Sequence, residues 1–173
     1  MEQKREMLRH MLAALAYRTQ KALRGAPADF GEFRTAPDVR TPRELVEHMT
    51  NVIGYTRTFF VGGTCRPESL PTLAAEAERF HAVLKQLDEQ FGNGAFDRIS
   101  PERLLQGPLS DAMSHAGQLA LLRRLFGSPV PPEDFVFADV SIGNLSADQS
   151  DPVAPDAEWS TPSGPQRRRE DGA

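Results

Sequence analysis

The stretch GPLSDAMSHAGQLALLRRLFG, residues 107–127, decides the fold, because it carries the signals of one amphipathic helix from end to end. Pro108 suits the first turn of a helix, where a backbone N–H would lack an intrahelical partner in any case. Gly127 and Pro129 are typical of the positions just beyond a helix C-terminus. The inward positions recur at intervals of three and four residues and define one face, which consists of Leu109, Ala112, His115, Ala116, Leu119, Leu122 and Phe126.

Two polar side chains share this otherwise apolar face. His115 lies in its middle, and Asp111 comes four residues earlier, where side chains stack on the same side of a helix. An imidazole and a carboxylate on the buried side of a helix need hydrogen-bond partners or a metal ion, because burying them alone costs free energy. The pair is therefore the first candidate for a functional site.

Three other segments show the same helical period and predict three more helices. The second of them has the clearest start, because Thr41, Pro42 and Glu44 form a capping box with proline at the first helical position. Together with residues 107–127, these segments predict an all-α four-helix bundle. The expected helices, with the main residues of their inward faces, are residues 2–24 (Leu8, Met11, Leu12, Leu15), Pro42 to the Gly62–Gly63 pair (Leu45, His48, Met49, Val52) and residues 71–91 (Leu73, Ala77, Phe80, Leu84).

The first connection of the bundle is unusually long. Residues 25–40 exceed what two antiparallel neighbours require, so we expect them to cross an end or a side of the bundle, fastened by Phe30 and Phe33. Between the third and last helices, a short helical turn is expected over residues 100–105, before Pro108 begins the last helix.

The chain beyond Gly127 reads as an irregular, proline-rich C-terminal extension. Residues 146–173 are polar and have few apolar anchors, so we expect a largely disordered tail there. Five apolar residues are expected to pack the preceding part against the helices, which gives a bundle domain over residues 1–145: Phe135, Phe137, Val140, Ile142 and Leu145.

The composition limits the class of protein. The 173 residues carry a net charge of −4, which provides no field to attract a phosphate backbone, so we expect no nucleic-acid partner. No apolar run approaches the roughly 18 residues of a membrane span, so we expect no membrane partner.

The single cysteine, Cys65, excludes an intrachain disulfide, and no sequence neighbour would activate its thiol. We expect a cytoplasmic protein, since residues 1–20 are charged and lack the apolar core of a signal peptide.

A third polar residue leads to a metal hypothesis. His48 falls on the apolar stripe near the start of its helix, and neutral imidazole and carboxylate oxygen are both good ligands for first-row divalent metals. If the helical turns that carry His48, Asp111 and His115 lie at the same height along the bundle, the three side chains converge on one point. Three protein ligands leave coordination positions of a metal ion open for water or substrate. The alternative is that the histidines are core residues whose ring nitrogens are satisfied by hydrogen bonds.

The segments TPRELVEHM (41–49) and GPLSDAMSHAGQLALLRRLFGSPV (107–130), with the EDF and IGN segments that follow, resemble the DinB-like family of helical-bundle metalloenzymes. The resemblance implies that a histidine near the start of the second helix joins a His-x-x-x-His pair on the last helix around one divalent ion. His48 and His115 match the first and last of these ligands, while Asp111 takes the place of the middle histidine. The resemblance implies nickel, zinc or a similar ion, and the carboxylate shifts the preference toward harder ions such as Mn, Fe or Zn, so the expected cofactor is Zn, Ni, Mn or Fe.

The resemblance also implies a chemistry and an assembly. Relatives use the ion to bind and ionise a low-molecular-weight thiol, so we expect a metal-dependent thiol transferase or hydrolase that acts on a small electrophilic molecule, and a homodimer. Arg123 is a candidate for binding an anionic substrate, or else an exposed charge favoured by the helix dipole. Tyr55 and Gln118 are candidates for contacting the substrate or the metal ligands. The alternative function is a non-catalytic bundle that serves dimerisation or small-ligand binding.

Overall fold

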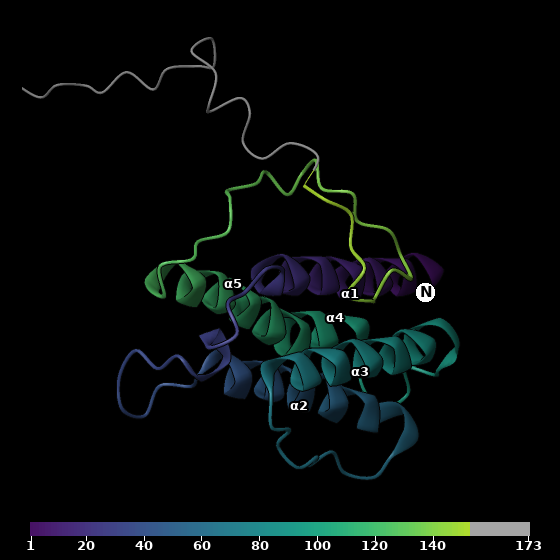
Figure 1. The fold of residues 1–173 in the computed structure, drawn as a ribbon. Coiled ribbons are helices and arrows are strands. Elements are labelled where there is room, and N and C mark those ends of the chain that lie inside the picture. The colour runs from purple at the N-terminus through teal and green to yellow at the C-terminus, as the bar shows by residue number, and fades with distance from the viewer. Residues whose placement is uncertain (153–173) are drawn as a thin grey trace, which may run out of the picture. The chain divides into compact units, whose positions relative to one another are not determined.

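Four long helices pack against one another in the computed structural model, which describes residues 1–152. The helices α2 and α3 lie side by side, and α1 lies against α3 and α5 (Figure 1). The described residues contain no strand, so the predicted all-α four-helix architecture is confirmed. None of the described helices combines the length and the apolar character needed to cross a membrane. The long helices are α1 (Glu2–Leu23), α2 (Pro42–Val61), α3 (Leu73–Asn93) and α5 (Ser110–Leu125), and the short α4 covers Pro101–Leu104.

The chain divides into two compact units. The first contains all of the helices, in Met1–Val130, together with the returning segment Val140–Gln149. Residues Pro131–Asp139, together with the described residues from Ser150 onward, belong to the second unit. The predicted division into a bundle over 1–145 and a disordered tail stays a prediction, because residues 153–173 lie outside the described part of the chain.

The core is built from the apolar stripes of all four long helices. Burial of one such side chain contributes about 1.5–3 kcal/mol relative to leaving it in water. On the opposite face of α1, His10 is exposed, as the helical period predicts. Large, fully buried side chains of the long helices include Leu12, Leu15, Tyr17, Met49, Ile53, Phe80, Leu84, Leu87, Phe91 and Leu119.

The helix ends follow the signals in the sequence. The Thr41 hydroxyl accepts a hydrogen bond from the Glu44 N–H (3.2 Å), and the Glu44 carboxylate accepts one from the Thr41 N–H (2.8 Å), which completes the capping box. After α5, Gly127 has a φ of 86°, a value that L side chains rarely adopt. The Ser128 N–H then donates to the Arg123 carbonyl (3.0 Å), as in a Schellman motif.

The start of the last helix differs from the prediction. The chain does not break at Pro108, because α4 continues through a π-helical turn, η2 (Leu105–Leu109), directly into α5. In an α-turn the proline ring would collide with the carbonyl four residues earlier, which also would lose its N–H donor. The wider π turn avoids this conflict, and the Ser110 hydroxyl donates to the Leu105 carbonyl (2.6 Å). Such turns often occur at functional sites, and this one ends directly before the helix that carries Asp111.

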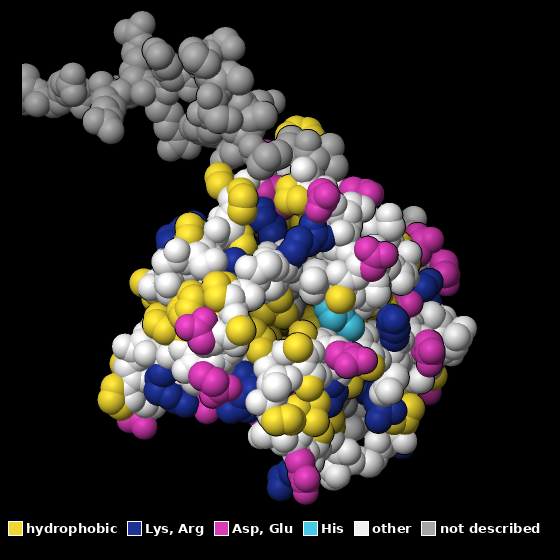
Figure 2. Space-filling view, viewed as in Figure 1, with side chains coloured by type: hydrophobic (Ala, Val, Ile, Leu, Met, Phe, Trp, Pro, Cys, Tyr) yellow, Lys and Arg dark blue, Asp and Glu magenta, His cyan; other side chains and the backbone are white. Residues whose placement is uncertain are grey.

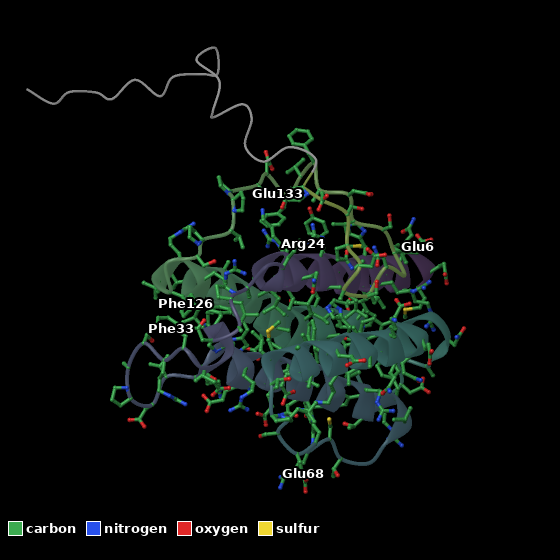
Figure 3. All side chains as sticks on the ribbon, viewed as in Figure 1. Glu6, Arg24, Phe33, Glu68, Phe126 and Glu133 are labelled. Carbon is green, nitrogen blue, oxygen red and sulfur yellow. The ribbon has the colours of Figure 1, made fainter. Side chains whose placement is uncertain are left out.

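Two phenylalanines fasten the long first connection, as predicted. Phe30, in the short turn η1 (Phe30–Glu32), is fully buried and packs edge to face on Phe126, with ring centroids 5.5 Å apart. Phe33 approaches the same ring at 5.2 Å (Figure 3). Aromatic pairs of this geometry contribute about 0.5–1.5 kcal/mol beyond the area that they bury. The connection is therefore fixed against Phe126, at the C-terminal end of α5.

The extension after α5 is buried less completely than expected. Leu145 is buried and Val140 packs on the core, but Phe135, Phe137 and Ile142 are each more than a third exposed. Their apolar character indicates that the segment can be buried. The apolar residues of this segment do not recur at a helical or strand spacing, however, so the sequence does not determine which of their side chains face inward.

A histidine of α3 holds the returning segment to the helices. The Nδ1 atom of His81 lies 2.8 Å from the Leu145 carbonyl, and because a carbonyl only accepts, this nitrogen carries the proton. Burial lowers the pKa of His81 below its usual value, which favours the neutral ring. His81 therefore has a structural contact that the sequence did not indicate.

Candidate metal centre

Three ligand-type side chains from two helices converge at the contact between α2 and α5. His48 lies in the second turn of α2, while Asp111 and His115 lie one turn apart in α5. One ligand atom from each lies within 4.8 Å of the other two. The described residues contain no second group of three such side chains. The structure thus brings together all three ligands that the sequence proposes.

The carboxylate of Asp111 lies close to both histidines. Its Oδ1 is 3.5 Å from Nε2 of His115, and its Oδ2 is 4.0 Å from Nε2 of His48. The two imidazole rings meet edge to face, with centroids 4.8 Å apart and planes inclined by 78°. Two ligands of a tetrahedral ion lie about 3.4 Å from each other. The Asp111–His115 spacing matches this value, and His48 requires only a small side-chain adjustment, so the residues fit a bound ion.

Exposure increases across the three ligands. The side chain of His115 is 11% exposed, that of His48 31% and that of Asp111 50%. The two imidazoles are therefore held in the packed region between helices, while the carboxylate faces solvent. This gradient leaves an approach to the centre from the Asp111 side.

Gln118 fixes the orientation of His115. Its Oε1 lies 2.9 Å from Nδ1 of His115, one turn earlier in the same helix. An amide oxygen only accepts hydrogen bonds, so Nδ1 carries the proton and Nε2 presents its lone pair toward Asp111. Metal-binding histidines usually donate their second N–H in this way, which holds both the tautomer and the ring. The structure therefore places Gln118 against a candidate ligand.

The surroundings of His48 favour its neutral form. Burial lowers the pKa of His48 below its usual value, and the positive charge of Arg40 lowers it further, whereas Asp111 acts in the opposite direction. Only the neutral imidazole has a lone pair for a metal ion. His48 is therefore available as a ligand at neutral pH.

A cavity of about 780 Å³ opens beside His48 and Asp111, and we call it the ligand cavity. Tyr55 lines its wall, is 57% exposed and packs edge to face on Phe59. Asn51 also lines it, and its buried Oδ1 has no hydrogen-bond partner among the described residues. Because an unpaired buried acceptor costs free energy, a donor on a bound water or substrate would satisfy it. The cavity thus offers space for a small molecule directly beside the candidate ligands.

Cys65 is a further residue of the ligand cavity, although its sequence neighbours did not indicate any role. The loop that carries Cys65 lies close against α2 at Gly54. A Cβ atom at position 54 would stand only 2.2 Å from the Cys65 sulfur. The approach therefore requires glycine at this point of α2 and brings the thiol into the cavity wall.

Arg123 is not among the residues that line the ligand cavity. It is only 4% exposed, and its guanidinium donates to the carbonyls of Ala22, Arg24 and Gly25 and to the carbonyl and hydroxyl of Ser128. The expectation of an exposed helix-end charge is wrong, because the side chain folds back onto the end of α1. Its role in substrate binding stays a prediction that no contact at the site supports.

Two residues of the site, Asn51 and Cys65, were missed by sequence reasoning. Asn51 follows His48 by three residues, the same spacing that places the predicted candidate Gln118 beside His115, so helical spacing was a signal that could have found Asn51. Cys65 had no such signal, because it lies in a loop whose path over α2 depends on tertiary packing. Sequence spacing therefore finds neighbours within a helix and not those that loops supply.

No protein-family model, curated protein or solved structure matches this chain. The fold and the site define the class: an all-helical, four-helix protein with a His–Asp–His group that could hold a metal ion. No family is identified, so the particular function has to be argued from the side chains.

Proposed function

We propose that the chain is a metal-dependent protein of the DinB-like type, which uses one divalent ion (Zn, Ni, Mn or Fe) for thiol transfer or hydrolysis on a small electrophilic molecule. The observation that carries the proposal is the convergence of His48, Asp111 and His115, with ligand atoms within 4.8 Å of one another on two packed helices. Two imidazoles and one carboxylate are a ligand set that suits these metals.

Each candidate ligand contributes differently to the centre. His115 is held by Gln118 with its Nε2 lone pair toward the centre, and His48 is kept neutral by its surroundings. Asp111 supplies the negative charge that offsets part of the charge of a divalent ion. Such an ion makes a bound thiol or water much more acidic and so supplies a nucleophile at neutral pH.

The ligand cavity supports a small-molecule substrate. Its volume of about 780 Å³ falls within the usual range of small-molecule sites, about 300–1,000 Å³. Tyr55 offers an aromatic face and a hydroxyl at the wall, and Asn51 offers a buried acceptor. A thiol and an electrophile bound in this space would lie next to the three ligands.

Metal stoichiometry tests the proposal directly. The full chain, purified without a histidine tag, is offered Zn, Ni, Mn or Fe(II) separately, dialysed and measured by elemental analysis. We expect about one equivalent of at least one metal, since three ligands on two helices form a single site. Less than about 0.1 equivalent of every metal, with no thermal shift, would favour the non-catalytic bundle instead. The rate at which a test electrophile is consumed is then measured with and without an added thiol. Thiol transfer requires the thiol, whereas hydrolysis proceeds without it. Light scattering measures the molar mass in solution and so tests the expected homodimer.

Gln118→Leu should weaken metal binding without removing a ligand. The leucine cannot accept the Nδ1 proton of His115, so the ring is free to take the wrong tautomer and orientation. We expect an affinity loss of about tenfold, as for other partners of metal-binding histidines. Competition with a chromophoric chelator measures it. Gln86→Leu, on the exposed side of α3, is the matched control and should leave the affinity unchanged. Equal affinities for both variants would show that Gln118 does not support the centre.

A further inference from the structure

A second cavity, of about 550 Å³, lies at the other end of the α2–α5 contact, and we call it the distal cavity. The ligand cavity is lined by residues 48–55 of α2 and 106–114 before and in α5, and the distal cavity by Leu45 and residues 118–125. The two helices run in opposite directions, so the metal ligands lie between the cavities. Gln118 connects them, since it lines the distal cavity and accepts the hydrogen bond from His115.

Arg40 brings an uncompensated positive charge to the distal cavity. The other arginines around the start of α2 are paired: Arg34 forms two bonds to Glu44 (2.9 and 3.0 Å), and Arg43 bonds to Glu32 (2.7 Å). Arg40 is exposed and forms no hydrogen bond or ion pair with any residue that the structure describes. Asp38 lines the same cavity without pairing to Arg40. The guanidinium is therefore available to an external anion.

The backbone around Arg40 is held in place, although its side chain is free. Arg34 donates to the Val39 carbonyl, and Thr41 forms the capping box of α2 directly after Arg40. The charge of Arg40 is close enough to His48 to lower the pKa of that histidine. Arg40 thus presents a positive charge near the candidate metal centre.

The remaining wall of the distal cavity is apolar and accessible. Leu121 and Leu125 of α5 are 50% and 57% exposed, and Val39 is 38% exposed. Hydrophobic side chains gather over this end of α5, whereas Lys, Arg, Asp and Glu are interspersed over the rest of the face (Figure 2). An apolar wall with one available cation suits a molecule that has an apolar body and an anionic group.

We infer that the substrate is an organic anion, a carboxylate or a phosphate, whose charged group pairs with Arg40 and whose apolar part lies on Leu121 and Leu125. This inference rests on the proposed function, because it takes the anion to be the substrate of the candidate metal centre, which lies on the same α2–α5 contact as the distal cavity. Arg40 is a substrate-binding residue in this arrangement and takes no part in bond making. Because only an anionic group can form this pair with the Arg40 guanidinium, Arg40 would also distinguish anionic from neutral substrates.

Hexanesulfonate and the uncharged hexyl methyl sulfone are the probes that test this inference. A sulfonate is a poor metal ligand, so its preference reports the arginine and not the ion. Titrations followed by amide chemical shifts, on the full chain with and without Zn, should show that the sulfonate binds about tenfold more tightly than the sulfone. The shifts should include residues 39–40 and 118–125.

Arg40→Gln should remove that tenfold preference and leave the affinity for the sulfone unchanged. Because Arg40 has no partner among the described residues, the variant should keep the melting temperature of the wild type. Arg124→Gln removes an equal charge at the same end of α5, outside the cavity lining, and should keep the preference. A preference that is absent in the wild type, or that survives in Arg40→Gln, overturns the inference. A chain that takes up no metal yet keeps an Arg40-dependent preference would overturn the proposed function alone.

Discussion

Replacing His115 by alanine is expected to abolish the stabilisation that a divalent ion gives to the chain. An ion that binds only the folded state, present at 100 times its Kd, raises the free energy of unfolding by about 2.7 kcal/mol. For a chain of this size, that change raises the melting temperature by about 5–10 °C. Scanning calorimetry of the wild type with Zn or Ni should show this rise, and His115→Ala should show none.

The stability of the metal-free variants distinguishes the loss of metal binding from an ordinary loss of core packing. Without metal, His115→Ala should cost on the order of 1–3 kcal/mol, because the ring is largely buried and bonded to Gln118. His48→Ala should lose the metal response as well, with a smaller loss of metal-free stability, since His48 is more exposed. His10→Ala is the control, because His10 lies exposed on α1. A metal response that persists in His115→Ala, or that disappears in His10→Ala, would show that the ion binds elsewhere.

The sequence predicts the helices well, because the signals for their ends are local. Thr41 and Glu44 satisfy each other within one turn, and Gly127 ends α5 through its own backbone conformation. Pro108 was misinterpreted because its preference for a first turn is only statistical. A π turn provides a second way to accommodate a proline inside a helical run, and it depends on how the flanking helices pack.

The same distinction between local signals and tertiary packing applies to the residues of the candidate site. Asp111 and His115 share a helix, so their spacing alone places them together. The meeting of His48 with this pair depends on the relative level of two antiparallel helices, which periodicity does not fix and only the family resemblance implied. Arg40 and Cys65 come from connections, whose paths over the helices are set by tertiary contacts. Local spacing therefore identifies pairs within the site, and packing completes it.

Two arginines illustrate why residue type alone does not assign a role. The sequence offered Arg123 as an anion-binding candidate on the helix that carries two of the ligands, but packing surrounds its guanidinium with carbonyls. Arg40 had no signal in the sequence and is the cation that remains unpaired beside the distal cavity. A guanidinium is available to a substrate only where the fold leaves its donors unused.

Arg123→Met should be among the most destabilising substitutions outside the core. Its guanidinium forms five hydrogen bonds that join the end of α1 to the end of α5, and it lies 5.5 Å over the ring of Phe30. Methionine preserves much of the apolar stem but leaves the buried Ala22 carbonyl without a donor. Unpaired buried acceptors cost about 1–3 kcal/mol each, so we expect a loss of about 3 kcal/mol. Urea unfolding of the metal-free chain measures it.

Arg124→Met is the matched control, because the neighbouring arginine is exposed and the same charge is removed at the same helix end. Its effect should stay within about 0.5 kcal/mol, as for other surface substitutions. Since Arg123 lies outside the ligand cavity, Arg123→Met should also keep its metal stoichiometry and the response to Zn under conditions where it is folded. If instead the variant were as stable as Arg124→Met but had lost the binding of an anionic probe, the substrate-binding role predicted from the sequence would be the correct one. The combination of stability and binding measurements therefore decides between the two roles of this residue.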